Sequence, residues 1–165
     1  MPADDLSRID VAEVFAVHGA SVYKRALYLL GNPADAEEAT QEVFIGVMRS
    51  KDAFRGQSLI STWLHSLTTH YCLNRLRNQR RRRVLLEQRG AGDGPTAPAS
   101  AADLVLLRRL LARADQDQAK AVIYVYLDGM SHDEAADILR VSRRTIGNLL
   151  LRFEQWAREQ TGSTP

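Results

Sequence analysis

The sequence predicts an all-α protein made of two small helical domains joined by a flexible linker. Apolar residues recur with helical rather than alternating spacing along most of the chain. Residues 89–100, RGAGDGPTAPAS, are rich in glycine and proline and have almost nothing apolar to bury, as is typical of a linker. A third observation is a pattern of two capped helices separated by a tight turn near the carboxyl end. We expect domains at 1–88 and 102–165, with the linker at 89–101.

Composition favours a protein that stays in the cytoplasm. Of the 165 residues, 45% are hydrophobic and 25% are charged, as in ordinary globular proteins. No apolar run approaches the roughly 18 residues that a membrane span requires. The first ten residues contain three aspartates and no apolar block behind a basic flank, so we expect neither a secretory signal nor membrane insertion.

The residues that usually carry catalysis or bind metals are sparse. The single cysteine, Cys72, has no CxxC companion and cannot form an internal disulfide, so we expect a buried thiol. The histidines His18, His65, His70 and His132 lack HExxH-type spacing, and no convergent acidic cluster is visible. We therefore expect no enzyme activity, no metal site and no cofactor.

Two helices are expected before residue 50. The first covers Val11–Leu30 and is closed by Gly31, after which Asn32 caps a second helix that begins at Pro33. The second helix carries an apolar stripe formed by Ala36, Thr40, Val43, Phe44, Val47 and Met48. Its polar stripe consists of Asp35, Glu38, Gln41 and Glu42. On these residues alone, the polar stripe is compatible with ordinary solvated surface.

The third expected helix joins an apolar face to a dense block of arginines. It follows a loop at Ser50–Ser58 that ends in a serine cap, and its inner face is formed by Ile60, Leu64, Leu67 and Tyr71. Six of the nine residues from Arg75 to Arg83 are arginine. Such a block repels itself unless it meets a polyanion, which indicates nucleic acid; the alternative is a solvated helix end.

Aromatic and polar residues precede the arginines on the same helix, among them Trp63, His70 and Asn74. Exposed rings give unpaired bases a surface to stack on, while arginines follow the phosphate backbone. This combination predicts binding of single-stranded nucleic acid. The alternative for Trp63 is simple packing in the core.

The second domain carries the most specific pattern in the chain. Helices are expected at about 102–114 and 118–127, and Ser131 with Glu134 forms a capping box at the start of a short helix that ends near Arg140. Val141 is expected to plug the turn, and Ser142 to cap the last helix. This arrangement is a helix-turn-helix unit, whose second helix enters the DNA major groove.

Residues suited to DNA contact lie on the outer face of that last helix: Arg143, Arg144, Thr145 and Asn148. Arginine suits guanine, asparagine suits adenine, and the helix start capped by Ser142 suits a phosphate. An ordinary helical hairpin is the structural alternative.

The motifs together resemble a known family. The runs DAEEATQEVFIGVM (35–48), FRGQSLISTWLHSLTTHYCLNRLRNQRRRR (54–83) and DGMSHDEAADILRVSRRTIGNLLLRF (128–153) look like regions 2 and 4 of extracytoplasmic-function (ECF) sigma factors, in order and at typical separation. The resemblance implies a factor that binds RNA polymerase core and directs promoter recognition and transcription initiation. A stand-alone helix-turn-helix regulator would explain the second domain but leave residues 35–83 without a role.

The resemblance also implies roles for particular residues. Asp35, Glu38, Gln41 and Glu42 match the surface that docks on the clamp helices of the polymerase beta-prime subunit. The −10 element of promoter DNA would be opened and held by Trp63, His70, Asn74, Arg75, Arg77 and Arg80. The −35 element would be read by Ser142, Arg143, Arg144, Thr145 and Asn148. The resemblance further implies contact with the beta subunit and possible control by an anti-sigma factor.

Three residues depart from the family's pattern. His70 stands where many members have asparagine, which leaves the captured base undefined. Arg140 replaces a frequent glycine of the turn, where a left-handed backbone would strain a residue with a Cβ. Gly147 stands where members often have a basic residue, and glycine inside a helix costs about 1 kcal/mol relative to alanine.

Overall fold

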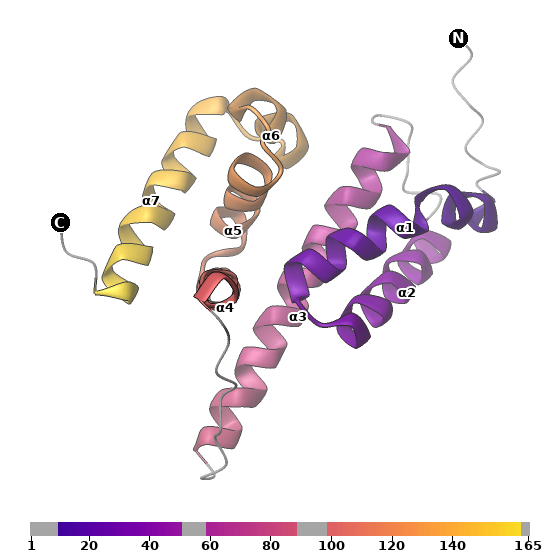
Figure 1. The fold of residues 1–165 in the computed structure, drawn as a ribbon. Coiled ribbons are helices and arrows are strands. Elements are labelled where there is room, and N and C mark those ends of the chain that lie inside the picture. Colours follow the sequence, from indigo (N-terminus) through magenta and orange to yellow (C-terminus); the bar gives the residue numbers. More distant parts are fainter. Residues whose placement is uncertain (1–9, 51–58, 89–98, 163–165) are drawn as a thin grey trace. The chain divides into compact units, whose positions relative to one another are not determined.

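The computed structural model describes residues 10–50, 59–88 and 99–162, and all the regular secondary structure in these ranges is helical (Figure 1). The helices are α1 (Val11–Leu30), α2 (Pro33–Ser50), α3 (Ile60–Glu87), α4 (Ala99–Arg113), α5 (Gln116–Val122), the π-helical turn η3 (Ile123–Leu127), α6 (His132–Leu139) and α7 (Arg143–Thr161). The predicted all-α class is confirmed. Of the expected loop at Ser50–Ser58, Ser50 belongs to α2 and residues 51–58 lie outside the described residues, as do residues 89–98 of the expected linker.

The chain divides into two compact units, Met1–Arg75 and Leu76–Pro165, so that α3 contributes to both. The domain limits predicted from composition place the division after α3 instead. They stay a prediction, because residues 89–98 of the expected linker are not described.

The junction between α1 and α2 follows from its sequence. Gly31 adopts the left-handed conformation with φ 74°, and its amide donates to the Leu27 carbonyl at 2.8 Å, which ends α1. The Asn32 side chain then accepts the Ala34 amide at 2.8 Å, and Pro33 occupies the first helical position. Both boundaries were predicted from the same residues.

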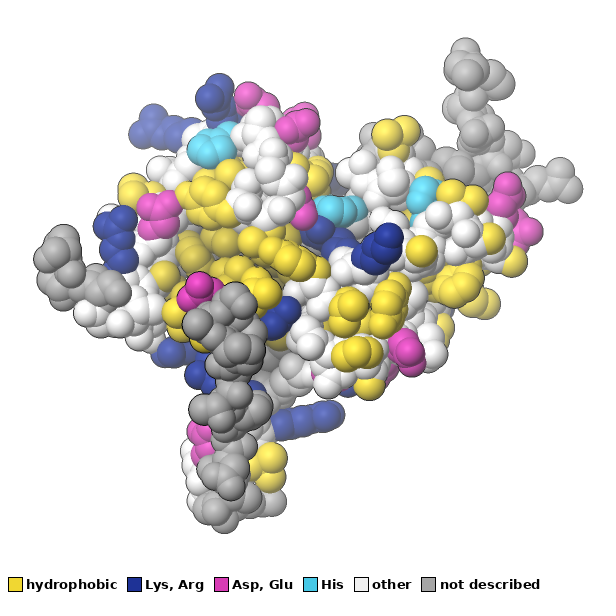
Figure 2. Space-filling model, in the orientation of Figure 1, with side chains coloured by type: hydrophobic (Ala, Val, Ile, Leu, Met, Phe, Trp, Pro, Cys, Tyr) yellow, Lys and Arg dark blue, Asp and Glu magenta, His cyan; other side chains and the backbone are white. Residues whose placement is uncertain are grey.

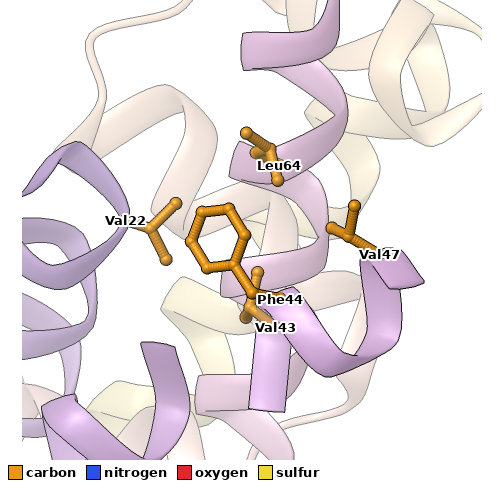
Figure 3. Close-up of a cluster of buried hydrophobic side chains, with 5 residues drawn as sticks. All are labelled: Val22, Val43, Phe44, Val47 and Leu64. Atoms are coloured by element: carbon orange, nitrogen blue, oxygen red, sulfur yellow. The ribbon is translucent and has the colours of Figure 1, made fainter. Parts of the chain in front are cut away.

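The core of the first unit lies where α1, α2 and α3 meet. Val22, Val43, Phe44, Val47 and Leu64 form its buried centre, and their side chains point toward one another in Figure 3. The stripe predicted on α2 is therefore correct, except that Met48 is 59% exposed. Met48 lies in the last turn of α2, and helical periodicity does not reveal how far a neighbouring helix extends.

The second unit packs α7 against α5 and α6 (Figure 1). Ile146, Leu150 and Phe153 are the buried residues of α7, and Ile123 and Tyr124 of η3 are fully buried. The helix expected at 118–127 begins earlier, at Gln116, because Asp115 caps it by accepting the Asp117 amide at 3.0 Å. α4 also begins earlier than expected, at Ala99.

Candidate nucleic-acid interface

The helix-turn-helix unit of α6 and α7 is held by caps at both helix starts. At α6 the Ser131 hydroxyl accepts the Glu134 amide at 3.2 Å, and the Glu134 carboxylate accepts the Ser131 amide at 2.8 Å, so the predicted capping box is confirmed. These bonds to Ser131 lower the pKa of the Glu134 carboxyl. At α7 the Ser142 hydroxyl accepts the Thr145 amide at 3.1 Å.

The turn between these helices depends on a left-handed residue. Arg140 has φ 55° and ψ 44°. In the described part of the chain, every other residue with positive φ is a glycine. The Val141 amide donates to the Ala136 carbonyl at 3.0 Å, which closes the turn through the backbone. The prediction that the Val141 side chain plugs the turn is wrong, because that side chain is 38% exposed.

The start of α7 presents the predicted DNA-contacting residues to solvent. Arg143, Arg144 and Asn148 are exposed, whereas Thr145 is half-buried and its hydroxyl lies 2.8 Å from the Ser142 hydroxyl. Arg143 Nη1 lies 3.5 Å from Asp133 Oδ2, with both side chains about 70% exposed (71% and 68%). This exposed pair is weak and leaves the guanidinium accessible to a phosphate or a base.

One side of α3 holds the aromatic and polar residues predicted to meet single-stranded DNA. Trp63, His70 and Asn74 are spaced by seven and four residues, which places them along one side of the helix. His70 is exposed, and its Nε2 lies 3.1 Å from Asn74 Nδ2. Trp63 is half-buried and packs against the core of the first unit, so it combines packing with partial exposure.

The arginines of α3 differ in what they contact. Arg80, Arg81, Arg82 and Arg83 are exposed, as expected for side chains that meet a polyanion. Arg77 is half-buried, and its Nη2 donates to the Ala114 carbonyl at 2.7 Å. In the space-filling view, Lys and Arg side chains project at several separate points of the face shown (Figure 2).

Arg75 lies among the acidic residues of α2. Its Nη1 and Nη2 donate to the two carboxylate oxygens of Glu38 at 2.7 and 2.6 Å, and Nη2 also donates to Asp35 Oδ1 at 2.7 Å. The structure thus brings one residue predicted for DNA together with two predicted for polymerase. The signal was present in the sequence, because Arg75 continues the inner face Leu64, Leu67, Tyr71 by one more turn.

Exposure to solvent differs along the polar stripe on α2. Gln41 and Glu42 are exposed, Glu38 is half exposed and Asp35 is mostly buried. The pKa of Tyr71, on the facing side of α3, is raised by burial and then by the negative charges of Glu42 and Glu38.

A small hollow between α1 and α3 was not anticipated from the sequence. It is lined by His18, Ser21 and Arg25 on one side and by Ser61 and His65 on the other. Arg25 is oriented there by the buried Thr69 hydroxyl, which accepts from Nη2 at 2.6 Å. Within the described ranges, no group of three or more His, Cys, Asp or Glu side chains could hold a metal ion.

The buried cysteine was predicted correctly. Cys72 is fully buried in the first unit, and burial raises the pKa of its thiol to about 12.

No helix in the described part of the chain is long and apolar enough to cross a membrane.

Comparison with protein families matches both units. Residues 14–82 match the model of sigma-70 region 2, and residues 104–153 match that of sigma-70 region 4. The two matched regions together are those of a transcription initiation factor. The chain belongs to the extracytoplasmic-function group of the sigma-70 family, which is not a class of enzymes.

Individual relatives share this membership. The ECF RNA polymerase sigma factor SigE of Mycolicibacterium smegmatis is 31% identical over 156 residues, which span 89% of this chain and 60% of that protein. SigM of Mycobacterium tuberculosis is 26% identical over 145 residues, spanning 81% and 68%. SigW of Bacillus subtilis is 23% identical over 163 residues, spanning 90% and 87%.

Solved structures show the same fold. The sigma factor RpoE in complex with the anti-sigma factor NepR from Bartonella quintana has a TM-score of 0.55 at 21% identity, over 94% of this chain and 99% of that one. CnrH in complex with the cytosolic domain of CnrY has a TM-score of 0.56 at 16% identity, over 94% and 89%.

Proposed function

We propose that this protein binds RNA polymerase core in the cytoplasm and directs it to promoters with separate −10 and −35 elements. The observation that carries the proposal is the capped helix-turn-helix unit, with Arg144 and Asn148 exposed on α7, in a chain whose first unit matches sigma-70 region 2. A stand-alone helix-turn-helix regulator is not favoured, because it leaves the first unit without a role.

The −35 element is read by the start of α7. Arg144 and Asn148 lie one turn apart on the face opposite Ile146 and Leu150, so both can reach base edges in one major groove. Arg143 and the Ser142 end of the helix then meet phosphates, where the helix dipole favours negative charge. Thr145 contributes mainly through its part in the cap.

The −10 element is held by α3 as an unpaired strand. Trp63 stacks on a base, and the His70–Asn74 pair presents imidazole and amide groups for hydrogen bonds to a base edge. Capturing a base costs a few kcal/mol of unstacking, which these contacts offset. Arg77 and the exposed Arg80 follow the backbone phosphates.

Polymerase core is bound through the polar stripe of α2. Glu38, Gln41 and Glu42 offer carboxylate and amide groups along one exposed line, with the mostly buried Asp35 at its start. Such a surface suits a basic partner such as the clamp helices of the beta-prime subunit. We further propose an anti-sigma partner for this chain, because the two structural relatives named above were solved in complexes with NepR and CnrY.

Reconstituted transcription tests the proposal. Purified bacterial core polymerase is assayed for run-off transcripts on a promoter library, with and without the protein. The expected result is a set of transcripts that depend on the protein and share a two-part motif upstream of their start sites. Identical transcripts in both reactions would show that the protein does not direct polymerase to promoters.

A further inference from the structure

The arginine at position 75 is engaged by carboxylates rather than presented to a nucleic acid. Its two terminal nitrogens make three bonds of 2.6–2.7 Å, two to Glu38 and one to Asp35, and its side chain is only 21% exposed. Bidentate pairing of a guanidinium with a carboxylate is among the strongest and most directional of hydrogen-bonded contacts. Arg75 therefore belongs with the α2 surface.

The contacts fix the geometry of that surface. A glutamate on a helix surface loses rotamer freedom when a partner binds it, which weakens binding. Glu38 is already held in one conformation, yet half of its side chain remains exposed. A carboxylate has about four lone-pair sites, so Glu38 can still accept hydrogen bonds from a cationic side chain of a partner.

We infer that Arg75 is a positioning residue of the polymerase-binding surface, where it orients Glu38 and Asp35 for a basic partner, and is not a contact to −10 DNA. This inference rests on the proposed function. The surface is then built from two helices, with carboxylates from α2 and an orienting guanidinium from α3. The pair also brings α3, the proposed DNA-binding helix, into direct contact with the core-binding surface.

The test compares the affinity of Arg75→Ala and of the wild-type full chain for purified polymerase core, measured by fluorescence anisotropy. The matched control is Arg49→Ala, which removes the same charge from an exposed position on α2. We expect Arg75→Ala to weaken core binding about three- to tenfold, and Arg49→Ala to leave it unchanged. Thermal unfolding of each variant checks that the fold persists.

A double-mutant cycle separates positioning from general structural support. In a Glu38→Gln background, Arg75→Ala should add little further loss, because the oriented carboxylate is already gone. Arg75→Lys should recover only part of the affinity, since lysine cannot form the bidentate pair. If Arg75→Ala does not fold, Arg75→Lys with and without Glu38→Gln gives the same comparison.

Three results would overturn the inference. In the first, Arg75→Ala binds polymerase core as well as wild type and its holoenzyme binds promoters more weakly, which would make Arg75 a DNA contact. Tighter core binding by Arg75→Ala would mean that Arg75 shields the carboxylates from the partner. Additive losses in the cycle would show that it acts independently of Glu38. If wild type itself fails to bind core, the proposed function falls as well; equal binding by wild type and variant overturns this inference alone.

Discussion

Arg75 donates to both carboxylate oxygens of Glu38, at 2.7 and 2.6 Å, and so joins the helix predicted to hold DNA to the helix predicted to hold polymerase. The pairing raises the pKa of the Arg75 guanidinium, first through its bond to Glu38 and then through its bond to Asp35. The arginine therefore stays charged throughout the physiological range. An arginine-rich segment does not define a DNA surface by itself, because each side chain has its own contacts.

Replacing Arg144 with alanine should weaken binding to the −35 element without affecting core binding. Arg144 is exposed at the start of α7, where a base contact is worth about 1–3 kcal/mol. Gel-shift titration of holoenzyme on promoter DNA measures the loss. Arg158→Ala, near the other end of α7, is the control and should bind normally; equal losses in both variants would mean a nonspecific charge effect.

Replacing Trp63 with alanine should impair promoter opening. Loss of one stacked base is worth about 1–3 kcal/mol, and permanganate footprinting of unpaired thymines measures the open fraction. Because Trp63 also packs on the core, Trp63→Phe is the matched variant that keeps a ring. If promoter opening fails equally in Trp63→Ala and Trp63→Phe, or if Trp63→Ala no longer binds polymerase core, the role of Trp63 is packing.

Arg140→Gly should stabilise the protein. Arg140 holds a left-handed conformation at φ 55° that costs a residue with a Cβ about 1 kcal/mol. Urea unfolding should show a gain of roughly that size, reduced by the greater freedom of glycine in the unfolded chain. The same change at the exposed helical Arg152 should instead destabilise the protein by about 1 kcal/mol. A loss of stability at both positions would show that the left-handed backbone at Arg140 is not strained.

Gly147→Ala should also stabilise the protein, by about 1 kcal/mol. A Cβ built at Gly147 meets nothing within 4 Å, so the added methyl group is accommodated within α7. Gly19→Ala is the comparison, because its new Cβ would lie 3.3 Å from the Phe15 ring. We expect this variant to gain less stability than Gly147→Ala, or to lose stability. Unfolding midpoints that rank the two variants in the opposite order would refute this.

Cys72 should resist thiol reagents in the folded protein at pH 8. Its pKa of about 12 leaves about one thiolate in ten thousand, and burial blocks access. Stability linked to this thiol is fully present below the ordinary pKa of about 9 and declines as pH rises from 9 toward 12. Rapid labelling by Ellman's reagent without denaturant would contradict the assignment, whereas labelling in guanidinium is the positive control.

Local signals predicted much of this structure. Gly31, Asn32 and Pro33 defined the junction of α1 and α2, and Ser131, Glu134 and Ser142 defined the helix-turn-helix unit, because caps act over three or four residues. The strain expected at Arg140 was also found, since the turn geometry depends on one residue's φ. Such features are readable from sequence because their causes are local.

Other features depend on contacts between distant residues. Sequence spacing groups Arg75 with its neighbouring arginines, although its position on the inner face of α3 brings it to Asp35 and Glu38, about forty positions earlier. The start of α4 at Ala99 was hidden by the adjacent glycine- and proline-rich segment. Asp115, which caps α5 through the Asp117 amide, lies three residues ahead of the helix start expected at Gln118.

Binding of the purified chain to purified polymerase core, followed by binding of promoter DNA, tests most directly whether one protein bridges the two. At modest ionic strength the chain should bind core saturably at one to one, and the complex should select two-part promoters with an affinity that falls steeply as salt rises. No affinity for core, together with DNA binding that core does not alter, would reduce the protein to a general DNA-binding module.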